Sequence, residues 1–417
     1  MPTLATAGKH AGNEETPNNK SIAMSENKAL SGITVFDATQ GVAGPHGTML
    51  MAQHGANVIK VEPIEGDWCR TLGKTYDDLC AHFVTFNRGK RSLALDLKNP
   101  EGVKLAQRLA YEADVVVESF RPGVMKRFGL DYETVKRHKP DTIYLSVTGF
   151  GQEGPNNHLP VTDSVIQAFS GWMSINRDAE GTPQRIGMIA IDVLTGLYAF
   201  QALSTAVLRK LRFGEGSYVD CSLMQAAAAF QSAKISEFHL ENGAPEVLYV
   251  PVGTMKTADS YINVTAMRER HYVSLCEVLG RPDLIDDERF NTREKRVARE
   301  AELMPIIRAE FLKRTTAEWA ALLTEVEVMN APIKTYGDFL ADQQVAAVDG
   351  IAWVEHDALG RVPVSNIPGL PKLAGGEPES SSPHIGQHST AVLREAGLGA
   401  EEIETLLQSG AIAQRAG

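Results

Sequence analysis

The stretch that decides the fold is ITVFDATQGVAGPHGTMLMAQHGANVIKVE, residues 33–62. Residues 33–37 form a short apolar run typical of a buried strand, and residues 40–45 form a glycine-bearing turn. A helix is predicted over residues 47–53 and a second strand over residues 57–62. A strand, a turn, a helix and a strand in such a short span form a βαβ unit, whose two strands run parallel.

The turn in this unit departs from the motif that binds dinucleotides. It reads GVAGP over residues 41–45, whereas the dinucleotide fingerprint reads GxGxxG. Pro45 has no N–H to offer a phosphate. The turn therefore argues against a dinucleotide site.

The same alternation continues along the chain. Strands are predicted over residues 93–98, 115–118 and 142–147, with an amphipathic helix over residues 101–112. Alternating strands and helices indicate a doubly wound α/β domain. After residue 242 or so the pattern becomes mostly helical and charged, which predicts a smaller, separate domain.

Composition narrows the class of protein. The chain has 417 residues, of which 43% are hydrophobic, and a formal net charge of −11. Because phosphate backbones are bound by clustered Lys and Arg, nucleic acid is not expected as a partner. Four scattered cysteines without CxxC spacing read as reduced thiols, so neither a zinc site nor a disulfide framework is expected. No apolar run of membrane-spanning length and no signal peptide are recognised, which predicts a cytoplasmic protein without a membrane partner.

Six cationic residues gather near the predicted strand ends. Ligands of open α/β sheets bind outside the carboxyl ends of the strands. These charges would match a phosphorylated ligand, but a solvated surface explains them equally well. The six are Arg88, Lys90, Arg91, Lys98, Arg121 and Arg127.

One carboxylate interrupts a long apolar run. In RIGMIAIDVLTGLYAF, residues 185–200, Asp192 follows a strand predicted over residues 189–191 and precedes a helix predicted over residues 193–211. At a helix N-terminus the backbone N–H groups and the macrodipole favour an ionised carboxylate. Asp192 is therefore either a helix cap or a nucleophile. Asp163 is predicted to cap a second helix, over residues 164–170.

Several familiar catalytic sets are missing from the sequence. It contains no GxSxG elbow, P-loop or HExxH motif, and its histidines are isolated. Two classes remain: an enzyme of acyl transfer that acts on a phosphorylated carrier, and a dinucleotide oxidoreductase. The absence of GxGxxG favours acyl transfer, in which a carboxylate can act as the nucleophile.

Four motifs in order give the chain a family resemblance. They are residues 30–63, FNRGKRSLALDLKNPEG (86–102), ADVVVESFRPGVMKRFGLDYE (113–133) and VTGFGQEGP (147–155) followed by QAFSG (167–171). From about Leu30 to the C-terminus the sequence resembles the family III coenzyme A transferases, which include carnitine and formate/oxalate CoA-transferases and the α-methylacyl-CoA racemases.

The resemblance implies an α/β architecture with a Rossmann-like large domain, a parallel sheet and a smaller inserted α+β domain. The expected division is a disordered leader over 1–29, a large CoA-binding domain over 30–224 and 331–417, and a small domain over 225–330. The resemblance also implies an interlocked homodimer.

The resemblance further implies the site residues. Asp192 falls on the aspartate that forms acyl anhydride and aspartyl-CoA thioester intermediates in the transferases. The glycine that precedes this aspartate in relatives is Ile191 here. Coenzyme A is expected to contact Val42, Ala43, Leu95, Lys98, Phe120 and Arg127.

The implied reaction moves CoA from an acyl-CoA thioester, with succinyl-CoA as a candidate, to a small carboxylic acid. No permanent cofactor and no metal are expected, because thioester and anhydride exchange need neither. Racemisation is the alternative function, but the racemases carry a His–Asp pair where this chain has Thr162 and Asp163, so one of the two proton-transfer groups is absent. Candidates to bind a second carboxylate of the acid are Arg185, Arg268 and Arg270, which could equally be surface charges.

Overall fold

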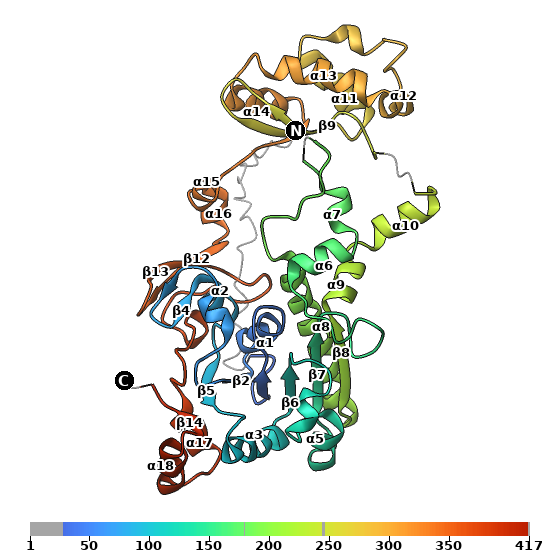
Figure 1. Ribbon diagram of the computed structural model, residues 1–417. Helices are drawn as coiled ribbons and strands as arrows, with labels where there is room; N and C mark the ends of the chain where they lie inside the picture. Colours follow the sequence, from blue (N-terminus) through green and yellow to red (C-terminus); the bar gives the residue numbers. More distant parts are fainter. Residues whose placement is uncertain (1–27, 179, 244–246, 416–417) are drawn as a thin grey trace, which may run out of the picture.

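The structure is a computed structural model of the chain and describes residues 28–178, 180–243 and 247–415 (Figure 1). The predicted leader lies outside the described residues except for its last two. Lys28 already forms an ion pair with Glu379, near the C-terminus of the chain.

A seven-stranded sheet forms the centre of the large body of the molecule, in the order β14-β5-β2-β1-β6-β7-β8 (Figure 1). Six strands run parallel, and β14 pairs antiparallel with β5 at one edge. The parallel strands follow the order of doubly wound dinucleotide-binding folds, and the direction of winding reverses between β1 and β6. The strands are β1 (Thr34–Ala38), β2 (Asn57–Glu62), β5 (Arg91–Leu95), β6 (Val115–Glu118), β7 (Ile143–Thr148), β8 (Ser217–Ser222) and β14 (Ile412–Ala413).

Helices cover both faces of the sheet, so β6 near its middle carries apolar side chains on both sides. In β6, Val116 belongs to one hydrophobic core, while Val115 and Val117 belong to the core on the opposite face. The predicted bounds of β2 and β6 are confirmed. The principal covering helices are α1 (Ala43–Gln53), α3 (Pro100–Glu112), α5 (Tyr132–His138), α8 (Ala190–Phe213), α9 (Leu223–Phe230), α17 (Ser389–Glu395) and α18 (Ala400–Gln408).

Helices α1 and α8 pack closely because glycines lie where they cross. A Cβ atom on Gly196 would lie 2.6 Å from Cβ of His46, and one on Gly47 would lie 3.0 Å from Cβ of Ala199. His46 Nδ1 lies 3.0 Å from the carbonyl oxygen of Val193 in the first turns of α8. Helix α1, which belongs to the βαβ unit, therefore sets the position of α8.

Length and composition alone would let α8 cross a membrane, with a mean hydropathy of 1.4 over its apolar window. The sequence-based statement that no apolar run reaches that length was wrong. In the structure α8 contributes Ile191, Ala199, Leu203 and Val207 to the core on one face of the sheet. Its apolar character is therefore partly explained by packing within the fold.

A separate hydrophobic core lies in the upper lobe of Figure 1, between Val250 and Val328. An antiparallel sheet in the order β11-β10-β9 carries the helices of this lobe. Its boundaries at residues 225 and 330 stay a prediction. The long helix predicted over residues 222–240 is interrupted at Gln231, where α9 ends and α10 (Ser232–Leu240) begins. The elements of the lobe are β9 (Val252–Lys256), β10 (Tyr261–Thr265), β11 (Met329–Pro332), α11 (Glu269–Val278), α12 (Arg293–Ala298), α13 (Glu300–Phe311) and α14 (Thr316–Glu325).

The chain then returns to the large body. It passes through α15 (Tyr336–Leu340), α16 (Gln343–Ala347) and a hairpin of β12 (Ile351–His356) and β13 (Gly360–Ser365) before α17, α18 and β14. Because β14 pairs with β5, the C-terminal segment completes the sheet that the N-terminal residues begin.

Candidate active site

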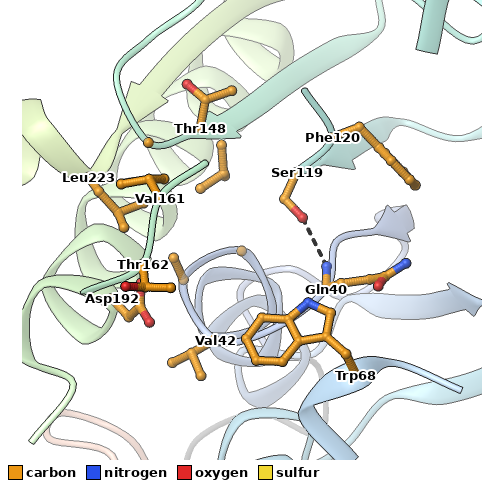
Figure 2. Close-up of a pocket in the computed structure, with 14 residues that line it drawn as sticks. Gln40, Val42, Trp68, Ser119, Phe120, Thr148, Val161, Thr162, Asp192 and Leu223 are labelled. Atoms are coloured by element: carbon orange, nitrogen blue, oxygen red, sulfur yellow. Dashed lines mark hydrogen bonds between the residues drawn. The ribbon is translucent and has the colours of Figure 1, made fainter. Parts of the chain in front are cut away.

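A cavity of about 300 Å³ opens where the winding of the sheet reverses, at the carboxyl ends of β1 and β6 (Figure 2). Gln40 follows β1 and Ser119 follows β6, and the Gln40 N–H donates to Ser119 Oγ at 2.9 Å. This is the position at which open α/β sheets bind ligands. Other lining residues include Val42, Ala43, Trp68, Thr148, Thr162 and Asp192.

Asp192 contributes the only carboxylate among the described residues that line this cavity. It lies in the first turn of α8, which begins at Ala190. The strand predicted over residues 189–191 was therefore wrong, because Ile189 precedes the helix and Ala190 and Ile191 are its first residues. Asp192 is not the N-cap either; Ile189 holds that position, and its side chain makes no capping hydrogen bond.

The capping carboxylate of α8 comes from another helix. Asp163 is the first residue of α6 (Asp163–Phe169), and its Oδ2 accepts the N–H groups of Ile191 at 2.6 Å and Asp192 at 3.1 Å. Thr162, not Asp163, is the N-cap residue of α6, so the predicted capping role of Asp163 on its own helix was wrong. Asp163 is 5% exposed.

The electrostatics of Asp192 differ from the sequence-based expectation. Burial and, as the smaller cause, the neighbouring Asp163 carboxylate together raise the pKa of its carboxyl to about 7. The helix N-terminus was expected to keep Asp192 ionised, but Asp163 occupies the free N–H groups there. Asp192 consequently gains and loses its proton near neutral pH.

The N-terminus of α1 borders the same cavity. Val42 and Ala43, both predicted contacts of coenzyme A, line the cavity at the start of this helix. No side chain caps α1, and the first N–H groups of a helix have no partners within it. These N–H groups and the helix dipole can stabilise negative charge that develops on a substrate oxygen.

A second cavity, of about 220 Å³, adjoins the first, because Gln40 and Phe120 line both. Three of the predicted contacts, Leu95, Lys98 and Phe120, line this second cavity. Arg127 ends α4 (Val124–Arg127), is exposed and lines neither cavity. The structure thus brings five of the six predicted contacts together with Asp192 along one path.

Three of the six cationic residues near the strand ends contact other parts of the protein and do not line these cavities. Lys90 is buried, and its Nζ lies 2.9 Å from Asp37 Oδ2, while Arg88 is buried and donates from Nη2 to the Ser365 carbonyl oxygen at 3.2 Å. Arg91 is the first residue of β5, at the opposite end of the strand from the cavities, and pairs with Glu395. Of the six, only Lys98, Arg121 and Arg127 are therefore free, within the described part of the chain, to contact a phosphorylated ligand.

Trp68 is a lining residue that the sequence analysis missed. A Cβ atom on Gly41 would lie 2.3 Å from its ring, so the indole packs directly on the turn that follows β1. The buried carboxylate of Asp67 holds this arrangement by accepting the Gly41 N–H at 3.0 Å and Lys60 Nζ at 2.8 Å. Gly41 has a positive φ, which is the only local sign of a tight turn here, and it does not indicate that the Trp68 ring packs on that turn.

The three arginines proposed to bind a second carboxylate do not line the cavity of Asp192. Arg185, Arg268 and Arg270 are exposed, and Arg270 lies 3.7 Å from Glu327. Their reading as surface charges fits the structure of a single chain.

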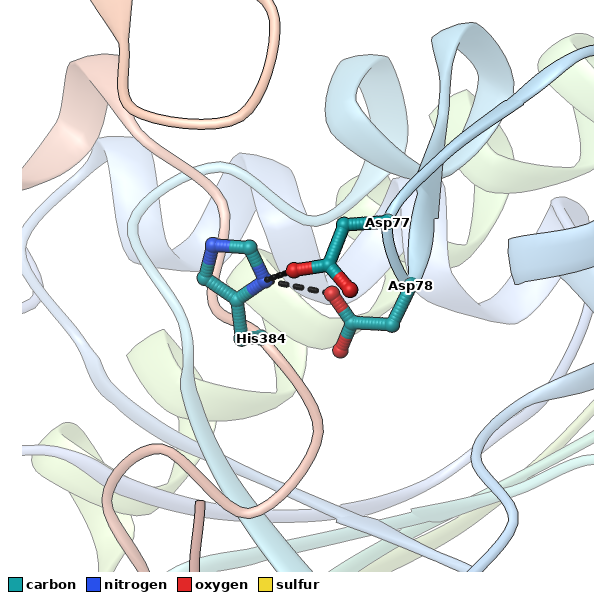
Figure 3. Close-up of side chains that lie close together, drawn as sticks. All are labelled: Asp77, Asp78 and His384. Atoms are coloured by element: carbon teal, nitrogen blue, oxygen red, sulfur yellow. Dashed lines mark hydrogen bonds and ion pairs between the residues drawn. The ribbon is translucent and has the colours of Figure 1, made fainter. Parts of the chain in front are cut away.

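Asp77, Asp78 and His384 form a cluster with metal-ligand spacing away from these cavities (Figure 3). The same groups already have partners in the structure. His384 Nε2 lies 3.0 Å from Asp357 Oδ2, and Arg415 Nη2 lies 2.6 Å from Asp77 Oδ2. The cluster is explained as a set of hydrogen bonds and ion pairs that joins the C-terminal segment to the hairpin of β3 (Thr75–Tyr76) and β4 (Leu79–Cys80).

Comparisons with known proteins agree on one enzyme class. The family model named CoA-transferase family III matches residues 30–389. Succinyl-CoA:glutarate CoA-transferase of Mus musculus is 33% identical over 403 residues, which cover 93% of this chain and 91% of the mouse protein. Succinate–glutarate CoA-transferase of Agrobacterium fabrum is 33% identical over 382 residues, which cover 88% and 95% of the two chains. A crystal structure of a CAIB/BAIF family protein from Brucella suis superposes with a TM-score of 0.79 at 31% identity, covering 89% and 100%.

Proposed function

The chain belongs to CoA-transferase family III and transfers CoA between acyl-CoA thioesters and carboxylic acids, and we propose that Asp192 is the nucleophile of this transfer. The observation that carries the proposal is the placement of Asp192 in the cavity at the reversal of the sheet, opposite the uncapped N-terminus of α1 (Figure 2).

The proposed reaction begins when a carboxylate oxygen of Asp192 attacks the acyl carbonyl of the donor. The carbon–sulfur bond of the donor breaks, so that CoA leaves as a thiolate and a mixed acyl–aspartyl anhydride remains. The thiolate then attacks the aspartyl carbonyl, which releases the donor acid as a carboxylate and leaves an aspartyl-CoA thioester. The acceptor carboxylate reverses these steps.

The N-terminus of α1 supplies the electrostatic part of this proposal. Each attack places negative charge on a carbonyl oxygen, and backbone N–H groups aimed at that oxygen stabilise the transition state more than the ground state. Val42 and Ala43 provide such groups beside Asp192.

Coenzyme A is proposed to extend from the second cavity to the first. Its phosphates would lie near Lys98 and its pantetheine arm along Phe120, which borders both cavities. Arg127 lies between Val124 and Phe128, which line the second cavity, and its exposed guanidinium is proposed to bind a phosphate at the rim. A planar guanidinium and an ammonium both suit phosphate oxygens.

Succinyl-CoA is the proposed donor, and a small dicarboxylic acid is the proposed acceptor, because the relatives from Mus musculus and Agrobacterium fabrum carry such names. Among the described residues, no cationic side chain lines the cavity of Asp192. A cationic side chain to pair with a second carboxylate of the acid would therefore have to come from a group that closes over the cavity.

An interlocked homodimer is proposed to supply that closure. Leu211 is 70% exposed, Phe213 63% and Leu240 77%, which leaves large apolar side chains of α8 and α10 facing water in one chain. Exposed apolar surface of this kind marks interaction sites.

The four free, buried cysteines suit the cytoplasmic location that we propose.

Transfer and racemisation are separated by one incubation in deuterium oxide. The enzyme is mixed with succinyl-CoA, a 2-methylacyl-CoA and a panel of carboxylic acids, and the products are read by mass spectrometry. The proposal predicts new CoA thioesters of an acceptor acid without deuterium at carbon. Deuterium at the α-carbon of a 2-methylacyl-CoA without acyl exchange would instead establish the racemase.

A further inference from the structure

The contact between α6 and α8 has a role beyond holding two helices together. Helix α8 has no capping side chain of its own, and Asp163 Oδ2 accepts the N–H of the nucleophile itself at 3.1 Å. The second contact, to the Ile191 N–H, is 2.6 Å long. The backbone of the turn that carries Asp192 is therefore fixed by a carboxylate 29 residues earlier in the chain.

A second buried side chain extends this contact into a clamp. Gln167, one turn after Asp163 on α6, donates from Nε2 to Asp163 Oδ1. Its Oε1 accepts the Ile186 N–H at 3.0 Å, and Nε2 also lies 3.3 Å from the Met188 carbonyl oxygen. Gln167 is 0% exposed. The pair thus holds both the loop before α8 and the first turn of α8.

We infer that Asp163 is a positioning residue for CoA transfer: its buried carboxylate caps α8 and so fixes both the direction in which Asp192 faces the cavity and the charge that Asp192 meets there. This inference rests on the proposed role of Asp192 as the nucleophile.

The charge of Asp163 has a consequence for the reaction. Like charges disfavour ionisation, so Asp163 adds to the effect of burial in raising the pKa of Asp192 to about 7. A carboxylate that binds its proton more tightly is also the stronger nucleophile once it is ionised. The contacts of Asp163 and Gln167 would hold Asp192 in place with its raised pKa, and neither residue would contact the substrate.

The other titratable groups around the turn do not replace Asp163. On α1, His46 contacts the Val193 carbonyl oxygen, and burial lowers the pKa of His46 to about 4, which leaves it neutral. On α2 (Ala81–Phe86), His82 borders an apolar cavity together with Ile189 and Val193 on the other side of the turn.

The test compares Asp163→Ala and Asp163→Asn with the unmodified enzyme. Asp163→Ala removes the cap, and we expect kcat of transfer to fall more than tenfold while the KM for acyl-CoA changes less than twofold. Asp163→Asn keeps an acceptor oxygen but removes the charge. It should restore most of kcat at pH 8 and move the acidic limb of the pH–rate profile down by about one pH unit.

Asp342→Asn is the matched control, because Asp342 caps α16 by the same contacts to two N–H groups and lies outside both cavities. It should leave kcat and the acidic limb unchanged. An unmoved limb in Asp163→Asn, full kcat in Asp163→Ala, or an equal shift in Asp342→Asn would each overturn the inference.

A direct titration avoids dependence on how the variants fold. Carbon-13 NMR of the aspartate-labelled full chain, with the signal of Asp192 assigned by its loss in Asp192→Asn, should show titration near pH 7. Titration near pH 4 would overturn the inference even if Asp192 is the nucleophile. Normal transfer by Asp192→Asn would instead overturn the proposed mechanism and leave the titration to decide the role of Asp163.

Discussion

At the scale of single residues, the chemistry depends on how Asp192 exchanges its proton. A nucleophilic carboxylate must be ionised, and burial raises the pKa of this one to about 7. Below that pH the group is a neutral acid and cannot attack a thioester. The raised pKa is consistent with a functional role, because perturbed groups in clefts are candidates for catalysis.

The pH dependence of transfer follows from this shift. We expect kcat to be constant above about pH 8 and to fall with a slope approaching tenfold per pH unit below pH 7, as Asp192 takes up its proton. Steady-state assays between pH 5 and 9, at acid concentrations that saturate the enzyme throughout the range, measure it. A profile flat down to pH 5 would contradict the assignment.

Lys98 is expected to act on binding alone. It lines the cavity proposed for the nucleotide end of coenzyme A, at a distance from the reacting carbonyl. Lys98→Ala should raise the KM for acyl-CoA about tenfold, the value of roughly one charge-assisted hydrogen bond, and leave kcat within twofold. Lys104→Ala, at an exposed position on α3, is the control. A fall in kcat alone would argue against this placement of coenzyme A.

At the scale of elements, the position of Asp192 depends on the crossing of α1 and α8. Both helices and their sheet strands could be predicted from hydrophobic patterns, because each pattern is local. The predicted strand over residues 189–191 failed for a non-local reason. Its β-branched residues suit a strand, but the Ile191 N–H is satisfied by Asp163 from another helix, which no local pattern shows.

The same limit applies to the candidate site. Motifs with family counterparts led to Asp192, Val42, Ala43, Leu95, Lys98 and Phe120, which the structure brings together. Trp68 and the capping role of Asp163 were not found, because each depends on a contact between segments far apart in sequence. The charges at the strand ends were over-counted, because the sequence does not show that Lys90 is buried beside Asp37.

The crossing of the two helices can be tested with one methyl group. In Gly196→Ala the new Cβ would lie 2.6 Å from Cβ of His46, so α8 must shift away from α1. We expect a loss of about 1–3 kcal/mol in the free energy of unfolding, typical of overpacking, together with a fall in kcat. Chemical denaturation and initial rates measure the two effects.

Gly337→Ala in α15 is the comparison, because its Cβ would make only an ordinary contact of 3.6 Å with Thr335 Oγ1. It should be neutral or slightly stabilising, since alanine favours a helix. If both variants behaved alike, close packing of α1 on α8 would not explain the position of Asp192.

At the scale of the whole molecule, one chain leaves the site open and apolar helix surfaces exposed. A proposed homodimer accounts for both, because the same association could bury the ends of α8 and α10 and bring a cation to the cavity. Light scattering coupled to size-exclusion chromatography should give about twice the 45.3 kDa mass of one chain.

Leu211→Glu combined with Phe213→Lys should weaken that association, because both side chains are largely exposed in one chain. Loss of the dimer should be accompanied by loss of transfer. A fully active monomer of the unmodified chain would contradict the proposal that a partner closes the site.

The central claim is that CoA passes through a covalent bond to Asp192, and a trapped adduct tests it most directly. The enzyme is incubated with succinyl-CoA without an acceptor, quenched with acid, digested and examined by tandem mass spectrometry. The account predicts a CoA thioester on the peptide at Asp192 that vanishes when acceptor acid is added and never forms in Asp192→Asn. Full transfer activity in Asp192→Asn, or an adduct at a different residue, would contradict it.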